Sequence, residues 1–155
     1  VHGTARAATR VAEPGEHPLA DLFNRLDRVS RDHSEHMSEI AERLARHMGL
    51  SSEACDALRV AGLLHDIGKI AVPDAVLMKP GTLTPAEYEV VKEHVVHSTR
   101  IVRALPHIDH ILAGVAHHHE RWDGKGYPNR LRETEIPLLA RILAIADSFS
   151  AMVMT

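Results

Sequence analysis

His65 and Asp66 are the first residues whose types and spacing suggest chemistry. They stand side by side within the apolar run of the segment VAGLLHDIGKIAVPD, residues 60–74, and Lys69 follows three residues later. Burying an imidazole or a carboxylate without a partner costs free energy, so the pair predicts a binding partner inside the fold. A metal ion can satisfy both groups at once.

Other histidines and an aspartate fall on the apolar faces of further predicted helices. His33 lies four residues before Met37, which starts an apolar stripe, and Asp147 stands where a Leu would be expected. His117, in contrast, follows His110 away from such a stripe. The inward-facing set consists of His33, His65, Asp66, His94, His118, His119 and Asp147.

Each of these residues also has a purely structural interpretation. A single inward His is ordinarily a hydrogen-bonded core residue, and a single buried Asp is ordinarily the partner of an Arg or a helix cap. If the whole set converges from five separate helices, however, desolvation and mutual repulsion require cations between the side chains. The remaining histidines are interpreted as surface residues or as neighbours behind the ligands: His2, His17, His36, His47, His97, His107 and His110.

The ligand types predict the kind of metal site. Imidazole and carboxylate without Cys favour Fe, Mn or Zn over a structural thiolate zinc site. Seven ligands exceed the need of one ion, so two ions are expected, with Asp66 as the bridge between them. Two ions about 3.5–4 Å apart are typical of phosphohydrolases. Lys69, one helical turn beyond His65, can reach a phosphate oxygen, although it can also be a solvated Lys at a helix end.

Composition limits the class of protein. With 155 residues, 45% of them hydrophobic and only 3% aromatic, the chain predicts one domain with an aliphatic core. The net charge of −3 without a basic stripe gives no indication of duplex nucleic acid as a partner. The single Cys55 excludes an internal disulfide and favours a reducing, cytoplasmic location. No apolar run approaches the roughly 18 residues of a membrane span.

Helical spacing recurs along most of the chain, and no stretch alternates as a strand does, so the fold is predicted to be all-α. Residues 1–18 resemble a linker, and residues 19–155 are expected to form the domain. Because the chain starts at Val1, we expect a sensor or receiver domain upstream. The predicted helices are 19–28, 32–48, 52–67, 85–104, 108–119 and 137–154, of which 19–28 is a candidate for pairing with a second copy or for capping the core.

The motif HDIGK, together with HHERWDGKGYP, resembles the HD-GYP family, all-helical bacterial phosphodiesterases of the HD superfamily that hydrolyse cyclic di-GMP. The connecting VPDAVLMKPGTL and the later LAIADSFSAM are also similar to that family, and the resemblance runs from Asp27 to Met152. It implies an HD-domain helical bundle with a metal site in its core and the same seven ligands. It also implies a phosphate contact for Lys69.

The loop Gly126, Tyr127 and Pro128 matches the motif that gives the family its name. The resemblance implies that this loop shapes the substrate side of the pocket and contacts partner signalling proteins. From the residues alone, the loop can equally be a rigid turn.

Three positions depart from the family pattern. Val29 replaces a Glu that binds a third ion in some members, which favours two ions. Val95 and Ser98 stand where the family has Pro and Gly after His94, which predicts a change in helix packing. The chain also ends soon after Asp147, so the domain is expected to be incomplete at its C-terminus.

The leading hypothesis is a phosphodiesterase that converts cyclic di-GMP to pGpG, GMP or both. Its cofactors would be two divalent transition-metal ions, iron first and manganese as the alternative, with Asp66 and Lys69 as the catalytic residues. One alternative is a signalling module that binds metal or nucleotide without turnover. Another is an HD phosphohydrolase acting on a different nucleotide, such as a dNTP or an alarmone.

Overall fold

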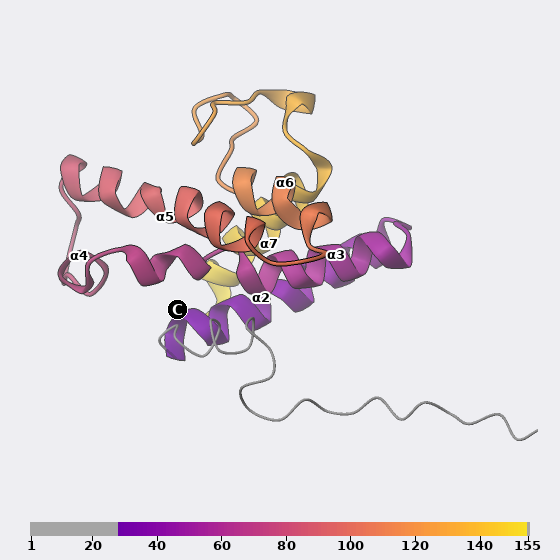
Figure 1. Ribbon diagram of the computed structural model, residues 1–155, viewed down its shortest axis with the longest axis horizontal. Coiled ribbons are helices and arrows are strands. Elements are labelled where there is room, and N and C mark those ends of the chain that lie inside the picture. The colour runs from indigo at the N-terminus through magenta and orange to yellow at the C-terminus, as the bar shows by residue number, and fades with distance from the viewer. Residues whose placement is uncertain (1–27, 155) are drawn as a thin grey trace, which may run out of the picture.

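The structure, a computed structural model, describes residues 28–154, and these residues contain helices and no strand. The all-α prediction is therefore confirmed. Figure 1 shows the elements in chain order: α2 (Arg28–His47), α3 (Ser52–Leu64), η1 (Ile67–Ala71), α4 (Asp74–Leu77), α5 (Pro85–Arg103), α6 (Asp109–His117), η2 (Glu133–Glu135) and α7 (Leu138–Val153).

The helices pack in a continuous bundle. The first described helix, α2, lies against α3 and α7. Helix α6 contacts α3, α5 and α7, and α5 also packs along η1. The C-terminal end of α7 returns to the N-terminal half of α2 (Figure 1). The buried core is aliphatic, as the low aromatic content predicts, and includes Met37, Leu58, Ile67, Ile111, Ile142 and Leu143.

Several predicted helix bounds are wrong in detail. The segment 52–67 is α-helical only to Leu64, because the backbone leaves helical geometry at Asp66 (φ −101°, ψ 5°) before the 3-10 helix η1. The helix predicted at 108–119 ends at His117, and the loop at 72–83 contains α4. In addition, α2 begins at Arg28, four residues before the predicted start, and the rest of 19–28 lies outside the described residues.

The start of α5 is fixed by a capping box, as the sequence TPAE predicts. The Glu87 N–H donates to Thr84 Oγ1, and the Thr84 N–H donates to Glu87 Oε2 at 2.7 Å. Lys79 Nζ donates to the same carboxylate, and these contacts with Lys79 and Thr84 lower the pKa of Glu87 to about 2. Because that pKa is lowered, the contribution of Glu87 is present above pH 4.5 and is lost as the pH falls toward 2.

Replacing Thr84 with Ala is expected to lower the free energy of unfolding by about 1 kcal/mol, because one backbone N–H of α5 loses its acceptor. Urea denaturation followed by circular dichroism measures the change. Thr82→Ala is the matched control, since Thr82 is exposed and lies outside the cap. Equal stability of the Thr84 and Thr82 variants would contradict the assignment.

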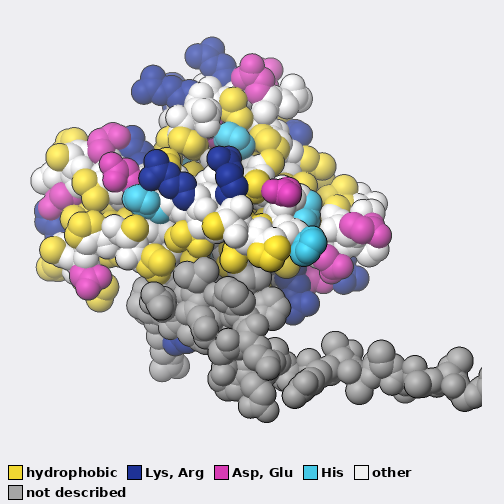
Figure 2. Space-filling model, viewed as in Figure 1, with side chains coloured by type: hydrophobic (Ala, Val, Ile, Leu, Met, Phe, Trp, Pro, Cys, Tyr) yellow, Lys and Arg dark blue, Asp and Glu magenta, His cyan; other side chains and the backbone are white. Residues whose placement is uncertain are grey.

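The described helices and one face of the surface bear on contact with membranes and charged partners. None of the described helices combines the length and hydrophobicity that crossing a bilayer requires. Figure 2 shows basic and acidic side chains interspersed with apolar ones over this face.

Candidate metal centre

His65 and Asp66 lie where α3 ends, and this position explains why two adjacent polar residues can both point into the core. His65 is the C-cap of α3, and Asp66 precedes η1. Their exposed fractions are only 0% and 3%. The chain turns between the two helices, so both side chains offer ligand atoms to the same group, together with His33.

Three histidines are oriented by the same kind of hydrogen bond to a backbone carbonyl group. In His65, His94 and His118, Nδ1 lies 2.6–2.7 Å from the carbonyl oxygen three residues earlier in the chain. Because a carbonyl only accepts, Nδ1 must carry the proton, and the neutral ring presents a lone pair at Nε2. All three Nε2 atoms are buried without a hydrogen-bond partner, which is the arrangement of metal ligands whose other nitrogen is fixed.

Asp66 lies at the centre of these imidazoles. Its Oδ1 is 3.1 Å from His94 Nε2, and its Oδ2 is 3.3 Å from His65 Nε2, although neither contact has hydrogen-bond geometry. A carboxylate oxygen facing an imidazole lone pair at this distance requires a cation, either a ring proton or a metal ion.

The ligand atoms form two groups that share one residue. Asp66, His94, His118 and His119 offer atoms within 4.8 Å of one another, and so do His33, His65 and Asp66. Asp66 alone belongs to both groups, as the predicted bridging role requires.

Asp147 joins this arrangement through His33. Its Oδ1 lies 2.8 Å from His33 Nε2, and both side chains line the same cavity, of about 550 Å³, as Asp66. Asp147 does not belong to either of the two compact groups. The structure therefore brings all seven predicted ligands to one site, with Asp147 at its edge.

The electrostatics keep most of these side chains in the form that binds metal. Burial and the neighbouring imidazoles lower the pKa of His118 well below its usual value, and they lower that of His119 to about 4. Burial alone would raise the pKa of Asp66, but His65, His94 and Lys69 hold it well below the usual range. For His65, burial lowers the pKa, but Asp66, Asp147 and the Gly62 carbonyl together outweigh burial and raise it. At neutral pH, His118 and His119 are thus neutral and Asp66 is ionised.

Tyr127 forms one wall of the site. Its ring stacks on His119 with centroids 4.9 Å apart, and its N–H donates to the His119 carbonyl oxygen at 3.2 Å. A side chain on Gly126 would overlap the backbone of Glu120 and Arg121, so this close approach requires glycine. Gly126 and Pro128 line an adjoining groove of about 780 Å³ and do not line the metal cavity itself.

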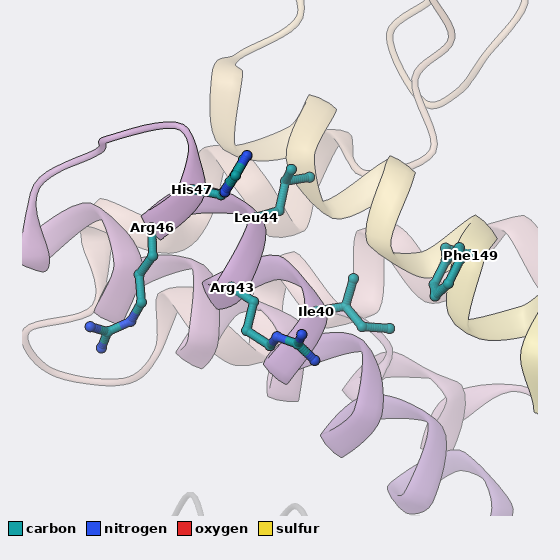
Figure 3. A pocket seen from close by; sticks show the side chains of 6 residues that line it. All are labelled: Ile40, Arg43, Leu44, Arg46, His47 and Phe149. Atoms are coloured by element: carbon teal, nitrogen blue, oxygen red, sulfur yellow. The ribbon is translucent and has the colours of Figure 1, made fainter.

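A separate groove lies between α2 and α7 (Figure 3). It has a volume of about 770 Å³, and its lining residues are Ile40, Arg43, Leu44, Arg46, His47 and Phe149. With one imidazole and no carboxylate, this groove lacks the ligand set of a metal centre.

The profile of the HD domain family matches residues 18–155 of this chain. The chain belongs to the HD domain family. The HD-domain fold is thereby confirmed. The curated relatives confirm the resemblance to cyclic di-GMP phosphodiesterases of the HD-GYP type.

The HD domain is similar to curated proteins with named activities. It is 46% identical over 129 residues to a "Cyclic di-GMP phosphodiesterase" of Thermotoga maritima, which covers 82% of this chain and 35% of that protein. It is 40% identical to "3'3'-cGAMP-specific phosphodiesterase 2" of Vibrio cholerae, over 90% of this chain and 28% of that protein. The chain thus spans about a third of the length of these relatives.

Two solved structures share the HD fold. The PgpH HD domain of L. monocytogenes, solved in complex with cyclic-di-AMP, has a TM-score of 0.66 at 21% identity, covering 93% of this chain and 76% of that one. Bd1817, an HDG"Y"P protein of Bdellovibrio bacteriovorus, has a TM-score of 0.69 at 23% identity, covering 87% and 45%.

Two residues of this HD domain, Glu120 and Ser98, support the site although the sequence analysis did not predict this role. Glu120 is buried, and its carboxylate accepts the N–H groups of Asn129 and Leu131 at 2.6 and 3.1 Å, which holds the loop that carries Tyr127. Its place after the paired histidines, before a loop rich in Gly and Pro, was the available signal.

Ser98 is the second residue whose role at the site the sequence did not predict. Its Oγ accepts the Gly68 N–H at 2.8 Å, and a side chain on Gly68 would overlap the backbone of His94 and Ser98. The departure from the family's Gly at position 98 therefore does not separate α5 from η1. Instead, the hydroxyl group ties the turn after Asp66 to the helix that carries His94.

Proposed function

We propose that this HD domain is a metal-dependent phosphodiesterase that hydrolyses a cyclic dinucleotide, with cyclic di-GMP as the first candidate substrate. The observation that carries the proposal is the convergence of three buried, unpartnered Nε2 atoms on Asp66, which belongs to both ligand groups. The names of the relatives support the substrate class, since they act on cyclic di-GMP and 3'3'-cGAMP.

The residues fit two divalent transition-metal ions, with Fe first and Mn as the alternative. His94, His118 and His119 would hold one ion, His33 and His65 the other, and Asp66 both, with Asp147 beside His33. Such ions supply an activated water and charge stabilisation for phosphoryl transfer.

The other side chains of the cavity orient the substrate. Lys69 Nζ lies 2.6 Å from Asp66 Oδ2 and lines the cavity, so it can exchange this contact for a phosphate oxygen next to the ligands. Tyr127 and Tyr88 border both the cavity and the adjoining groove, and Lys92 lies 5.4–5.5 Å from their ring centroids. The exposed Tyr88 ring offers an apolar face to a nucleobase, whereas one face of the Tyr127 ring is already stacked on His119.

The direct test is turnover of Fe- and Mn-loaded protein on a panel of cyclic di-GMP, 3'3'-cGAMP, cyclic di-AMP, a dNTP and an alarmone. We expect hydrolysis of a cyclic dinucleotide to its linear form, pGpG in the case of cyclic di-GMP, with GMP as a second product. Nucleotide binding without turnover of any substrate would favour the signalling module, and hydrolysis of the dNTP or alarmone alone would favour the other phosphohydrolases.

Lys69→Met is expected to reduce turnover about 10- to 100-fold, because one charge-assisted contact to phosphate is lost. Metal content should stay the same or rise, since Lys69 competes with a cation for Asp66 Oδ2. Elemental analysis and steady-state kinetics measure the two effects. Arg103→Ala, an exposed change on α5, serves as the control, and loss of metal from the Lys69 variant would show a structural role instead.

The biological setting follows from the same proposal. A cyclic dinucleotide is a second messenger, so we expect the domain to act in signalling. We therefore predict an upstream sensor or receiver domain, a cytoplasmic location and a signalling partner that binds the loop of Gly126, Tyr127 and Pro128. Pairing of two copies through residues 19–28 is a further prediction.

A further inference from the structure

Ser150 is a buried residue of α7 that lies between two histidines of α2. Its Oγ is 3.1 Å from His33 Nδ1 and 3.0 Å from His36 Nδ1, and its exposed fraction is 0%. On the other side of the His33 ring, Nε2 lies 2.8 Å from Asp147 Oδ1. A chain of hydrogen bonds thus runs from Asp147 through His33 and Ser150 to His36.

This arrangement sets His33 apart from the other ligands. The Nδ1 atoms of His65, His94 and His118 face backbone carbonyls, which only accept and therefore fix one neutral tautomer. The Nδ1 atom of His33 faces a hydroxyl group, which can donate or accept. The backbone therefore leaves the tautomer of His33 open.

The Ser150 Oγ also lies 3.4 Å from Met154 Sδ, but a thioether sulfur is a weak acceptor. The single hydroxyl proton therefore goes to one of the two imidazoles, which allows two arrangements of the chain. In one, His33 Nε2–H donates to Asp147, His33 Nδ1 accepts from Ser150, and His36 Nδ1–H donates to Ser150. In the other, His33 Nδ1–H donates to Ser150, the Ser150 hydroxyl donates to His36 Nδ1, and His33 Nε2 is a lone pair that faces the cavity. Only the second arrangement lets His33 bind a metal ion through Nε2.

We propose that Ser150 is a positioning residue for His33, and that its hydroxyl reverses from donor to acceptor toward His33 when a metal ion binds. The reversal moves the proton of His36 from Nδ1 to Nε2, so the tautomer of His36 reports the occupation of the site. This inference rests on the proposed metal centre.

The first experiment measures Zn²⁺ affinity by competition with a chromophoric chelator. Ser150→Ala is expected to weaken binding about 10- to 100-fold, the usual effect of removing the group that orients a ligand. Ile145→Ala is the control on the same helix, because Ile145 is 61% exposed and does not line the metal cavity. Its affinity should equal that of the unaltered protein.

A second variant keeps the test decisive if Ser150→Ala does not fold. His36→Phe retains a ring but has no nitrogen to receive the Ser150 proton, so Zn²⁺ affinity should fall severalfold. Thermal unfolding of the metal-free proteins shows which variants are folded.

The second experiment reads the tautomers directly, by long-range ¹H–¹⁵N spectra of imidazole-labelled protein at pH 8. Addition of Zn²⁺ should move the His36 proton from Nδ1 to Nε2 in the unaltered protein, and this change should be absent in Ser150→Ala. A role in packing alone would change neither tautomer nor affinity.

The two proposals can fail separately. If the unaltered protein binds no Zn²⁺, the metal centre and this inference are both overturned. If it binds Zn²⁺ with the same affinity as Ser150→Ala and His36→Phe, or if the His36 tautomer does not change, the inference about Ser150 is overturned and the metal centre stands.

Discussion

Asp66→Asn is expected to lower the metal content from close to two ions per chain to less than one, and to reduce turnover by at least about 1,000-fold. Asp66 belongs to both ligand groups, so its loss weakens both positions at once. The substitution keeps the size of the side chain but removes the negative charge that neighbouring His65, His94 and Lys69 stabilise. Two-metal catalysis requires both ions in place, so turnover falls with metal content.

Elemental analysis of anaerobically purified protein and initial-rate kinetics check this result. Asp56→Asn is a suitable control, because Asp56 is an exposed carboxylate of α3, the helix that ends before Asp66. Retention of two ions by Asp66→Asn would place the metals elsewhere, and loss of only one would mean that Asp66 does not bridge.

The three consecutive histidines at the end of α6, His117, His118 and His119, are expected to differ sharply in the effect of their replacement by Ala. His118→Ala and His119→Ala should each release metal and lower turnover by about 100-fold or more, since removal of a ligand exceeds the usual cost of removing its orienting partner. His117→Ala should keep both ions and change turnover by less than about threefold. The His117 Nδ1 lies 3.8 Å from Glu120 Oε1, and His117 belongs to neither ligand group.

His117→Ala is itself the control for its neighbours, because it removes the same side chain one residue away. Metal content, turnover and melting temperature measured on all three variants separate loss of a ligand from loss of the fold. Equal damage from His117→Ala and His118→Ala would contradict the geometry described for the end of α6.

The sequence carried enough information to predict that these side chains converge, because helical spacing and the apolar stripes repeat regularly. His33 and His94 occupy the inward faces that the periodicity predicts, and Asp147 reaches the same cavity from α7. His119 lies in the cluster, as the sequence predicts, but the helical-face premise is wrong, since α6 ends at His117 and the turn that follows directs His119 inward.

The roles of Ser98 and Glu120 could not be predicted from the sequence, because they depend on contacts between separate segments of the chain. Ser98 meets Gly68 across 30 residues, and Glu120 binds backbone groups of the loop that follows. Neither contact leaves a periodic signal, because a hydroxyl or a carboxylate that serves the backbone of another segment looks like any other polar residue. For the same reason, the short helix α4 was hidden among the turn residues of its loop.

The contact between His33 and Asp147 joins residues 114 positions apart. Joining the ends of a chain segment removes conformational entropy that grows only slowly with its length, by roughly 0.6 kcal/mol for each doubling. An ion held by both α2 and α7 would therefore act as a cross-link between the first and the last described helix. Its main effect on the polypeptide would be to suppress the partial opening of α7, which amide hydrogen exchange detects as slower exchange along that helix.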